Sequence, residues 1–139
     1  MSAEHFTQVH RLRMPIRWGD MDAMGHVNNT VYFRYFEQAR IAWFEAMGCP
    51  PDPSGIGPVI ISAHCTFFKQ LRYPGEIDIE TLVGDFGRSS FHTIHQIRRA
   101  DDPLTMIAEG GSKVVWVDQR QEKSVVLPED MRARLRMAF

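Results

Sequence analysis

Hydrophobic and polar residues alternate along the first segment of the chain that looks structured, residues 9–18. One side of the alternation carries the mostly apolar set His10, Leu12, Met14, Ile16 and Trp18, and the other side carries three arginines. A period of two places every second side chain on the same face of a strand. We therefore predict a half-buried strand over this segment.

The periodicity changes to that of a helix over residues 30–47. Asn28 or Asn29 would cap its start, and Gly48, followed by two prolines, would end it. Further apolar residues widen the hydrophobic stripe, so we expect a helix that is buried over most of its circumference. The apolar positions of this segment are Tyr32, Phe33, Tyr35, Phe36, Ala39, Ile41, Trp43, Phe44 and Met47.

Four further strands are predicted after a loop rich in proline and glycine, at residues 59–71, 77–86, 91–98 and 104–118. The short turns between them force antiparallel pairing. Gly110 and Gly111 inside the last strand suggest a bulge or bend, and residues 128–139 suggest a short terminal helix. The expected fold class is α+β: an antiparallel, five-stranded curled sheet wrapped round one long central helix.

Length and composition indicate one ordinary soluble domain over residues 1–139. The net charge of −1 gives no sign of a nucleic-acid partner, and no apolar run approaches the length of a membrane span. A secretion signal is absent from the polar start, so we expect a cytoplasmic protein. The two cysteines, Cys49 and Cys65, would then be reduced thiols.

Polar residues concentrate in the stretch WGDMDAMGHVNN, residues 18–29, directly before the predicted helix. The N-terminus of a helix presents unpaired N–H groups and partial positive charge, which can polarise a carbonyl oxygen. Asp22 lies close to this end and could attack a carbonyl carbon or activate a water. The same residue types also occur in any loop before a helix, so the residues alone leave both interpretations open.

The longer motif WGDMDAMGHVNNTVYFRYFEQAR resembles the hotdog-fold thioesterases, specifically the 4-hydroxybenzoyl-CoA thioesterase-like acyl-CoA thioesterases. HVNN is also similar to plant acyl-ACP thioesterases, and GRSSF and AEG…VVWVD extend the resemblance along residues 11–128. The element order is that of the hotdog fold. The resemblance implies an enzyme that hydrolyses an acyl-CoA thioester to free acid and CoA.

The resemblance also implies roles for individual residues. Asp22, the second acid of the D-x-D pair, would be the catalytic carboxylate, and Asp20 a loop or capping residue. The backbone amide of Asn29 would polarise the thioester carbonyl. His26 could orient the acyl carbonyl or water, or bond only within the loop. Met24 stands where acyl-ACP thioesterases have an asparagine, which argues against their mechanism.

Other polar residues receive weaker predictions. Arg88, Ser89 and Ser90 match the family region near the pantetheine and nucleotide of CoA. His92 and His95 would face opposite sides of a strand and make a poor metal pair. We expect no metal and no cofactor, because a thioester is already a reactive acyl group and CoA is part of the substrate.

Charged residues on the predicted helix favour an ordinary surface pair, with Glu37 flanked three residues away by Arg34 and Arg40.

Three other functions stay open at this point: an acyl-ACP thioesterase, a hotdog dehydratase or hydratase, and a non-catalytic acyl-CoA-binding module. The dehydratase would need a paired Asp and His in the helix context, which is not found. A single curled sheet also leaves edge strands open. The resemblance implies a C₂ homodimer or a dimer of dimers (homotetramer), in which Asp22 faces the partner near His64 or the strand that starts at Val59.

Overall fold

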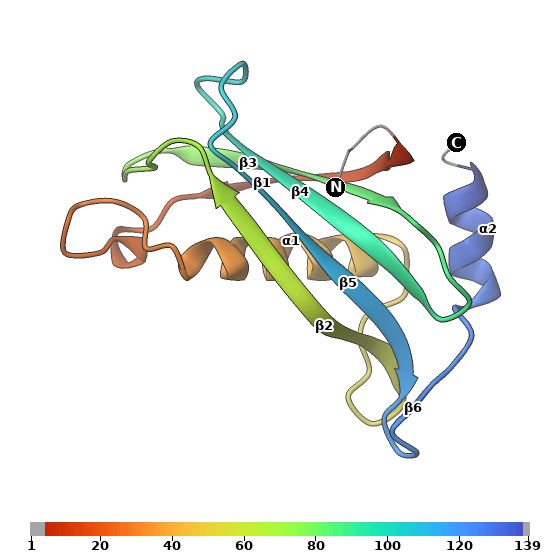
Figure 1. Ribbon diagram of the computed structural model, residues 1–139. Helices are drawn as coiled ribbons and strands as arrows, with labels where there is room; N and C mark the ends of the chain where they lie inside the picture. Colours follow the sequence, from red (N-terminus) through yellow and green to blue (C-terminus); the bar gives the residue numbers. More distant parts are fainter. Residues whose placement is uncertain (1–4, 138–139) are drawn as a thin grey trace.

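Five long strands form one antiparallel sheet in the computed structural model, which describes residues 5–137 (Figure 1). The strand order is β1-β3-β4-β5-β2, and a two-residue strand, β6, extends β5 at its end. The predicted five-stranded sheet is confirmed, with β6 as a sixth strand too short to be detected by alternation. The strands are β1 (Thr7–Pro15), β2 (Ile56–Phe67), β3 (Glu76–Gly84), β4 (Ser90–Arg99), β5 (Ala108–Asp118) and β6 (Lys123–Ser124).

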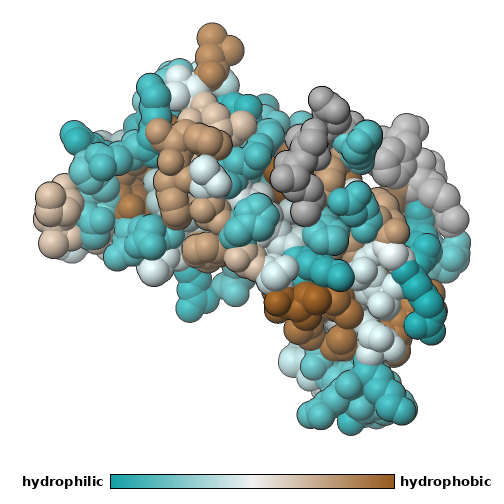
Figure 2. Space-filling model, viewed as in Figure 1, coloured by the Kyte–Doolittle hydropathy of each residue, from teal (hydrophilic) through white to brown (hydrophobic). Residues whose placement is uncertain are grey.

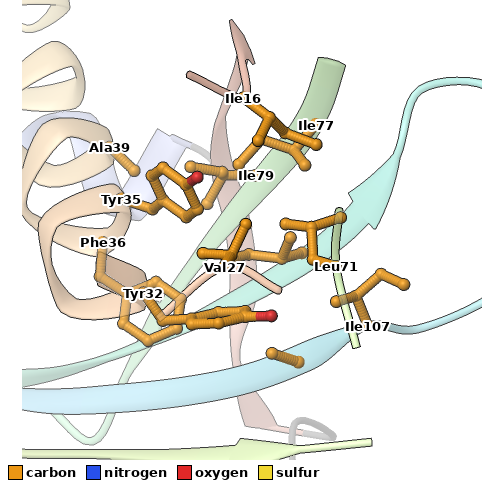
Figure 3. Packing of buried hydrophobic residues seen from close by; sticks show 12 residues of the cluster. Ile16, Val27, Tyr32, Tyr35, Phe36, Ala39, Leu71, Ile77, Ile79 and Ile107 are labelled. Carbon is orange, nitrogen blue, oxygen red and sulfur yellow. The ribbon is translucent and has the colours of Figure 1, made fainter. Parts of the chain in front are cut away.

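The helix α1 (Val31–Ala46) packs along one face of this sheet, and α2 (Glu129–Met137) lies at the far end of the molecule (Figure 1). Two hydrophobic clusters hold the layers together. Figure 3 shows the first, in which α1 residues face the sheet and the loops before α1 and after β2. The second includes Trp43, Phe44, Phe91, Trp116, Leu127, Met131 and Leu135. The terminal helix is therefore confirmed, since α2 buries Met131 and Leu135.

One face of α1 is exposed, which corrects the expectation of a helix buried over most of its circumference. The buried positions recur every three or four residues, as in an ordinary amphipathic helix. Phe33 is 38% exposed, and Arg34 and Glu37 are exposed beside it. One sheet can cover only one side of a helix, so the opposite side stays open in a single chain.

The helix ends as predicted, but its N-cap lies one residue after Asn29 and two after Asn28. Gly48 has a left-handed φ of +76°, and the N–H of Cys49 donates to the carbonyl of Phe44 over 2.9 Å. Thr30 occupies the N-cap position. Asn28 acts one step earlier, since its Oδ1 accepts hydrogen bonds from both the N–H and the hydroxyl of Thr30.

Strand boundaries account for several differences from the predictions. β1 stops at Pro15, and Trp18 sits in the 3₁₀ turn Trp18–Asp20 with 77% of its surface exposed. Leu104 is 95% exposed because it lies in the β4–β5 turn, not in β5. This turn projects from the sheet in Figure 1, and Figure 2 shows hydrophobic surface at its tip. The prediction that Trp18 and Leu104 lie in strands is therefore wrong, because it rested on their apolar character alone.

The expected bulge at Gly110 and Gly111 is absent, and the glycines serve close packing. The pairing of β4 with β5 runs through both positions without a register shift. A Cβ on Gly110 would meet the Phe36 ring, and a Cβ on Gly111 would lie 2.8 Å from Nε2 of His64. The irregularity on this side lies in β2, where the register shifts between Ile60 and Ser62.

No helix within residues 5–137 is long and apolar enough to cross a bilayer.

Candidate active site

The loop between β1 and α1 is closed by its own hydrogen bonds around Asp22. The N–H of Asp22 donates to the His26 carbonyl over 2.7 Å, and Met21 and Val27 form an isolated bridge. The Oδ1 atom of Asp22 accepts from the N–H groups of Met24 at 2.9 Å and His26 at 3.2 Å. Gly25 permits this reversal, because its φ of +78° suits glycine. One carboxylate oxygen is thereby fixed, which orients the other.

Two backbone contacts and one side chain fasten this loop to the core. Val27 donates to the carbonyl of Leu71 over 2.8 Å, and Asn28 to the carbonyl of Asp20 over 3.0 Å. The Oδ2 atom of Asp20 accepts hydrogen bonds from the Tyr35 hydroxyl and from the N–H of Arg17. Burial, and then this hydrogen bond, raise the pKa of Tyr35. Asp20 thus has the local structural contacts that the sequence predicted for it.

A cleft of about 350 Å³ opens between this loop, the start of α1 and the end of β2. Asp22, His26 and Asn29, the three predicted catalytic residues, all line it. The remaining lining residues are Val27, Tyr32, Phe67, Phe68, Lys69 and Gln70. The structure therefore brings together an acid, an imidazole, a helix start and an aromatic wall at one place.

The backbone amide of Asn29 is free to bind an oxygen atom in this cleft. Asn29 is exposed, and no atom of residues 5–137 accepts a hydrogen bond from its N–H. The amide lies at the N-terminal end of α1, where the peptide dipoles add partial positive charge. A carbonyl oxygen that gains negative charge would be stabilised here.

Sequence reasoning did not assign three of the residues that shape the cleft. Burial raises the pKa of Tyr32 to about 12, so its hydroxyl stays protonated, and its ring packs edge-on against Phe67 at 4.9 Å. Arg72 places Nη2 3.0 Å from Nε2 of His26. Phe67 and Arg72 come close to the loop through the pairing of Val27 with Leu71, which no local pattern records, whereas Tyr32 lies in the first turn of α1.

The residues predicted to bind CoA lie elsewhere in the chain. Arg88 and Ser89 occupy the β3–β4 turn and Ser90 begins β4, at the end of the sheet away from the Asp22 loop (Figure 1). The carbonyl of Arg88 accepts hydrogen bonds from the N–H of Leu127 and from the side chain of Arg132. One chain does not bring these three residues to the cleft.

The histidines of β4 face opposite sides of the sheet, as predicted. Burial, with a smaller effect of the Arg40 charge, lowers the pKa of His95 to about 3.

Within residues 5–137 no group of three or more histidine, cysteine or acidic side chains could hold a metal. Cys49 and Cys65 are free thiols.

Comparisons with known proteins give a family for these residues. The thioesterase-like superfamily matches residues 16–135. The solved PA2801 protein of Pseudomonas aeruginosa is 38% identical and superposes with a TM-score of 0.89, covering 92% of this chain and 98% of that one. The 4-hydroxybenzoyl-CoA thioesterase of Pseudomonas sp. (strain CBS-3) is 26% identical over 86% of this chain and 92% of its own.

A more distant structure shares the fold alone. The 1,4-dihydroxy-2-naphthoyl-CoA thioesterase from Synechocystis has a TM-score of 0.82 at 13% identity, with 90% of this chain and 93% of that chain covered.

Proposed function

This chain belongs to the thioesterase-like superfamily and is a thioester hydrolase with the hotdog fold, and we propose that it converts an acyl-CoA and water into a free acid and CoA. The observation that carries the proposal is the cleft that unites the Asp22 carboxylate with the free amide of Asn29. Relatives that act on aromatic acyl-CoA thioesters support CoA as the thiol.

The proposed reaction uses the two groups in sequence. The N–H of Asn29 donates to the thioester carbonyl oxygen and stabilises the charge that develops there. Oδ2 of Asp22 then either attacks the carbonyl carbon, giving a mixed anhydride that water hydrolyses, or takes a proton from the water that attacks. In both routes the carbon–sulfur bond breaks, and the CoA thiolate leaves and is protonated.

His26 supports this chemistry from the edge of the cleft. Its backbone N–H helps to fix Oδ1 of Asp22. The contact with Arg72 holds the imidazole against the loop after β2. We assign His26 an orienting role toward Asp22 and the attacking water.

We further propose that the site is completed by a second copy of the chain. β1 and β2 are the sheet edges, and β2 exposes Ile61 at 57% and Phe67 at 44%. Pairing of two β2 edges in a C₂ dimer would cover these side chains and place the Asp22 cleft at the interface. Arg88 is far from the cleft of its own chain. In the dimer, Arg88 of the partner subunit could reach the CoA bound in that cleft. A dimer of dimers is the larger assembly consistent with this symmetry.

The expected compartment is the cytoplasm, since two free thiols suit a reducing environment.

A substrate panel tests the proposed activity. Release of the thiol is measured for aliphatic and aromatic acyl-CoA thioesters and for matched acyl-ACP thioesters, in buffer containing EDTA. We expect turnover of acyl-CoA that chelation leaves unchanged. Preference for acyl-ACP would overturn the choice of CoA, binding without turnover would support the acyl-CoA-binding module, and activity restored by added metal would contradict the metal-free mechanism.

A further inference from the structure

Arg40 is a half-buried cation on the side of α1 that faces β2. Within residues 5–137 its side chain makes no hydrogen bond or ion pair, whereas Arg34 pairs with Glu37 at 2.9 Å. Of the two arginines predicted to flank Glu37, Arg34 thus forms the surface pair. Burial lowers the pKa of Arg40, with Glu37 acting weakly in the opposite direction. A guanidinium stays charged in proteins, and a charge removed from water is costly unless it is paired.

A second polar group without a partner lies beneath the same stretch of α1. His95 is fully buried; its Nδ1 is 3.0 Å from the Thr81 hydroxyl, and its Nε2 has no hydrogen-bond partner among residues 5–137. The imidazole stacks on the Phe36 ring at 5.1 Å. Buried donors and acceptors without partners are uncommon in native proteins and call for an explanation.

A second open cleft, which Arg40 lines, neighbours the active-site cleft along α1. About 230 Å³ of space lies between α1 and the β2 side of the sheet, lined by Phe33, Phe36 and Arg40 on the helix and by Ala63 and Gly111 on the strands. The active-site cleft is a separate space with neighbouring walls, since Asn29 lines it and Thr30 lines the second cleft. Its walls are Asn29 and Tyr32 on one side and Phe67 on the other.

We propose that Arg40 binds a carboxylate at the far end of the acyl group, so that the preferred substrates are ω-carboxyacyl thioesters. This inference rests on the proposed acyl-CoA hydrolysis. The carboxylate would supply the missing partner of the guanidinium, and the Phe33 and Phe36 rings would contact the methylene groups between the two ends. Charge favours this ligand, because the cleft carries Arg34 and Arg40 against the single acid Glu37.

The position of Arg40 along the helix restricts the length of the acyl chain. At the usual helical rise, the Cα atoms of Tyr32 and Arg40 are about 12 Å apart along the axis. An arginine side chain leans toward the N-terminal end of its helix, which brings the guanidinium closer to the cleft. A chain of medium length fits this span better than a short diacid or a long fatty acid.

Paired substrates test the proposal. kcat/KM is measured for adipoyl-CoA and suberoyl-CoA against the neutral hexanoyl-CoA and octanoyl-CoA. We expect the wild type to prefer the carboxylated member of each pair. Arg40→Gln should lower kcat/KM for the carboxylated members by roughly 10- to 100-fold, the range of one charge-assisted hydrogen bond, and leave the neutral members unchanged. Arg120→Gln is the matched control and should preserve the preference, because the Arg120 guanidinium donates to the Ser54 carbonyl outside the cleft.

Other outcomes would overturn the inference. If the wild type prefers the neutral thioesters, the inference about Arg40 is wrong and the hydrolase proposal stays intact. Equal loss on both members in Arg40→Gln, with dissociation seen by light scattering, would show that Arg40 pairs with a second copy of the chain. If no acyl-CoA is turned over, the hydrolase proposal fails separately. Calorimetry with suberoyl-CoA and octanoyl-CoA, on wild type and Arg40→Gln, then decides whether Arg40 binds the carboxylate.

Discussion

The Nη2 atom of Arg72 lies 3.0 Å from Nε2 of His26, across a separation of 46 residues. A guanidinium can only donate hydrogen bonds, so Nε2 accepts and the ring proton of the neutral imidazole resides on Nδ1. The contact therefore fixes both the position and the tautomer of a residue that lines the cleft.

Arg72→Met should release this constraint. We expect the His26 ring to lose its preference for the Nδ1–H tautomer, which ¹⁵N NMR of the imidazole reports. The value of kcat should fall by less than it does in Asp22→Asn. Arg120→Met is the control, because the Arg120 side chain donates a hydrogen bond to the distant Ser54 carbonyl. An unchanged tautomer ratio in Arg72→Met would contradict the assignment.

Asp22→Asn tests the catalytic carboxylate directly. Asparagine keeps an oxygen that can accept from the Met24 and His26 amides, so the loop should stay folded. Turnover should fall by roughly 10² to 10⁴, the contribution of a general base, or further if Asp22 is the nucleophile. Steady-state kinetics on the best acyl-CoA, with circular dichroism as the folding check, measure this.

Asp20→Asn is the comparison, and it should affect turnover much less. Its expected effect is on stability, because Asp20 holds the Tyr35 hydroxyl at 2.8 Å. Near-normal turnover in Asp22→Asn, or the reverse ranking of the two variants, would mean that the wrong acid is assigned.

Gly110→Ala should destabilise the interface between α1 and the sheet. The added Cβ would meet the Phe36 ring and lie 2.7 Å from the carbonyl oxygen of His64, which is backbone and cannot move aside cheaply. We expect a loss of about 1–3 kcal/mol in the free energy of unfolding, as for other overpacked cores. Gly19→Ala is the control, since no contacting atom of the described part of the chain lies within 4 Å of its Cβ position. Urea denaturation compares them, and equal stability would contradict the packing role.

Asp78 should make the stability of the fold depend on acid. Hydrogen bonds from Arg13, and then from Arg11, lower the pKa of this buried carboxyl to about 2 from an ordinary value of 3.8. The native state therefore favours the ionised form. This contribution is complete above about pH 4, shrinks as the pH falls toward 2 and is absent below.

Asp78→Asn isolates that contribution. At neutral pH the free energy of unfolding of the variant should be lower by about 1.5–3 kcal/mol, the contribution of hydrogen bonds to a charged group. Denaturation curves of both proteins from pH 2 to pH 7 should converge at the acid end. A stability difference that is constant over this range would contradict the assignment.

The shared-site proposal predicts that activity depends on concentration. If each cleft needs the edge strand of a second chain, dilution below the dissociation constant of the dimer should abolish turnover and assembly together. Light scattering and activity are measured over the same dilution series. A fully active monomer of 16.0 kDa would refute the shared site.

The sequence by itself determined the elements and their order. Alternation with a period of two located the five long strands, and helical spacing with Gly48 and the prolines located α1, because both signals depend only on neighbours along the chain. The stretch around Asp22 also identified the family through a local motif. Exposed apolar residues such as Trp18 and Leu104 misled this reasoning, since composition does not show whether a partner surface exists.

The tertiary structure alone decided which distant residues meet. The cleft exists because Val27 pairs with Leu71, which brings Phe67 and Lys69 opposite Asp22. The same packing half-buries Arg40 and leaves Arg34 exposed with Glu37, although both arginines are three residues from that acid. Periodicity records the face on which a side chain lies; the burial and the partner of its charge depend on what the fold places against that face.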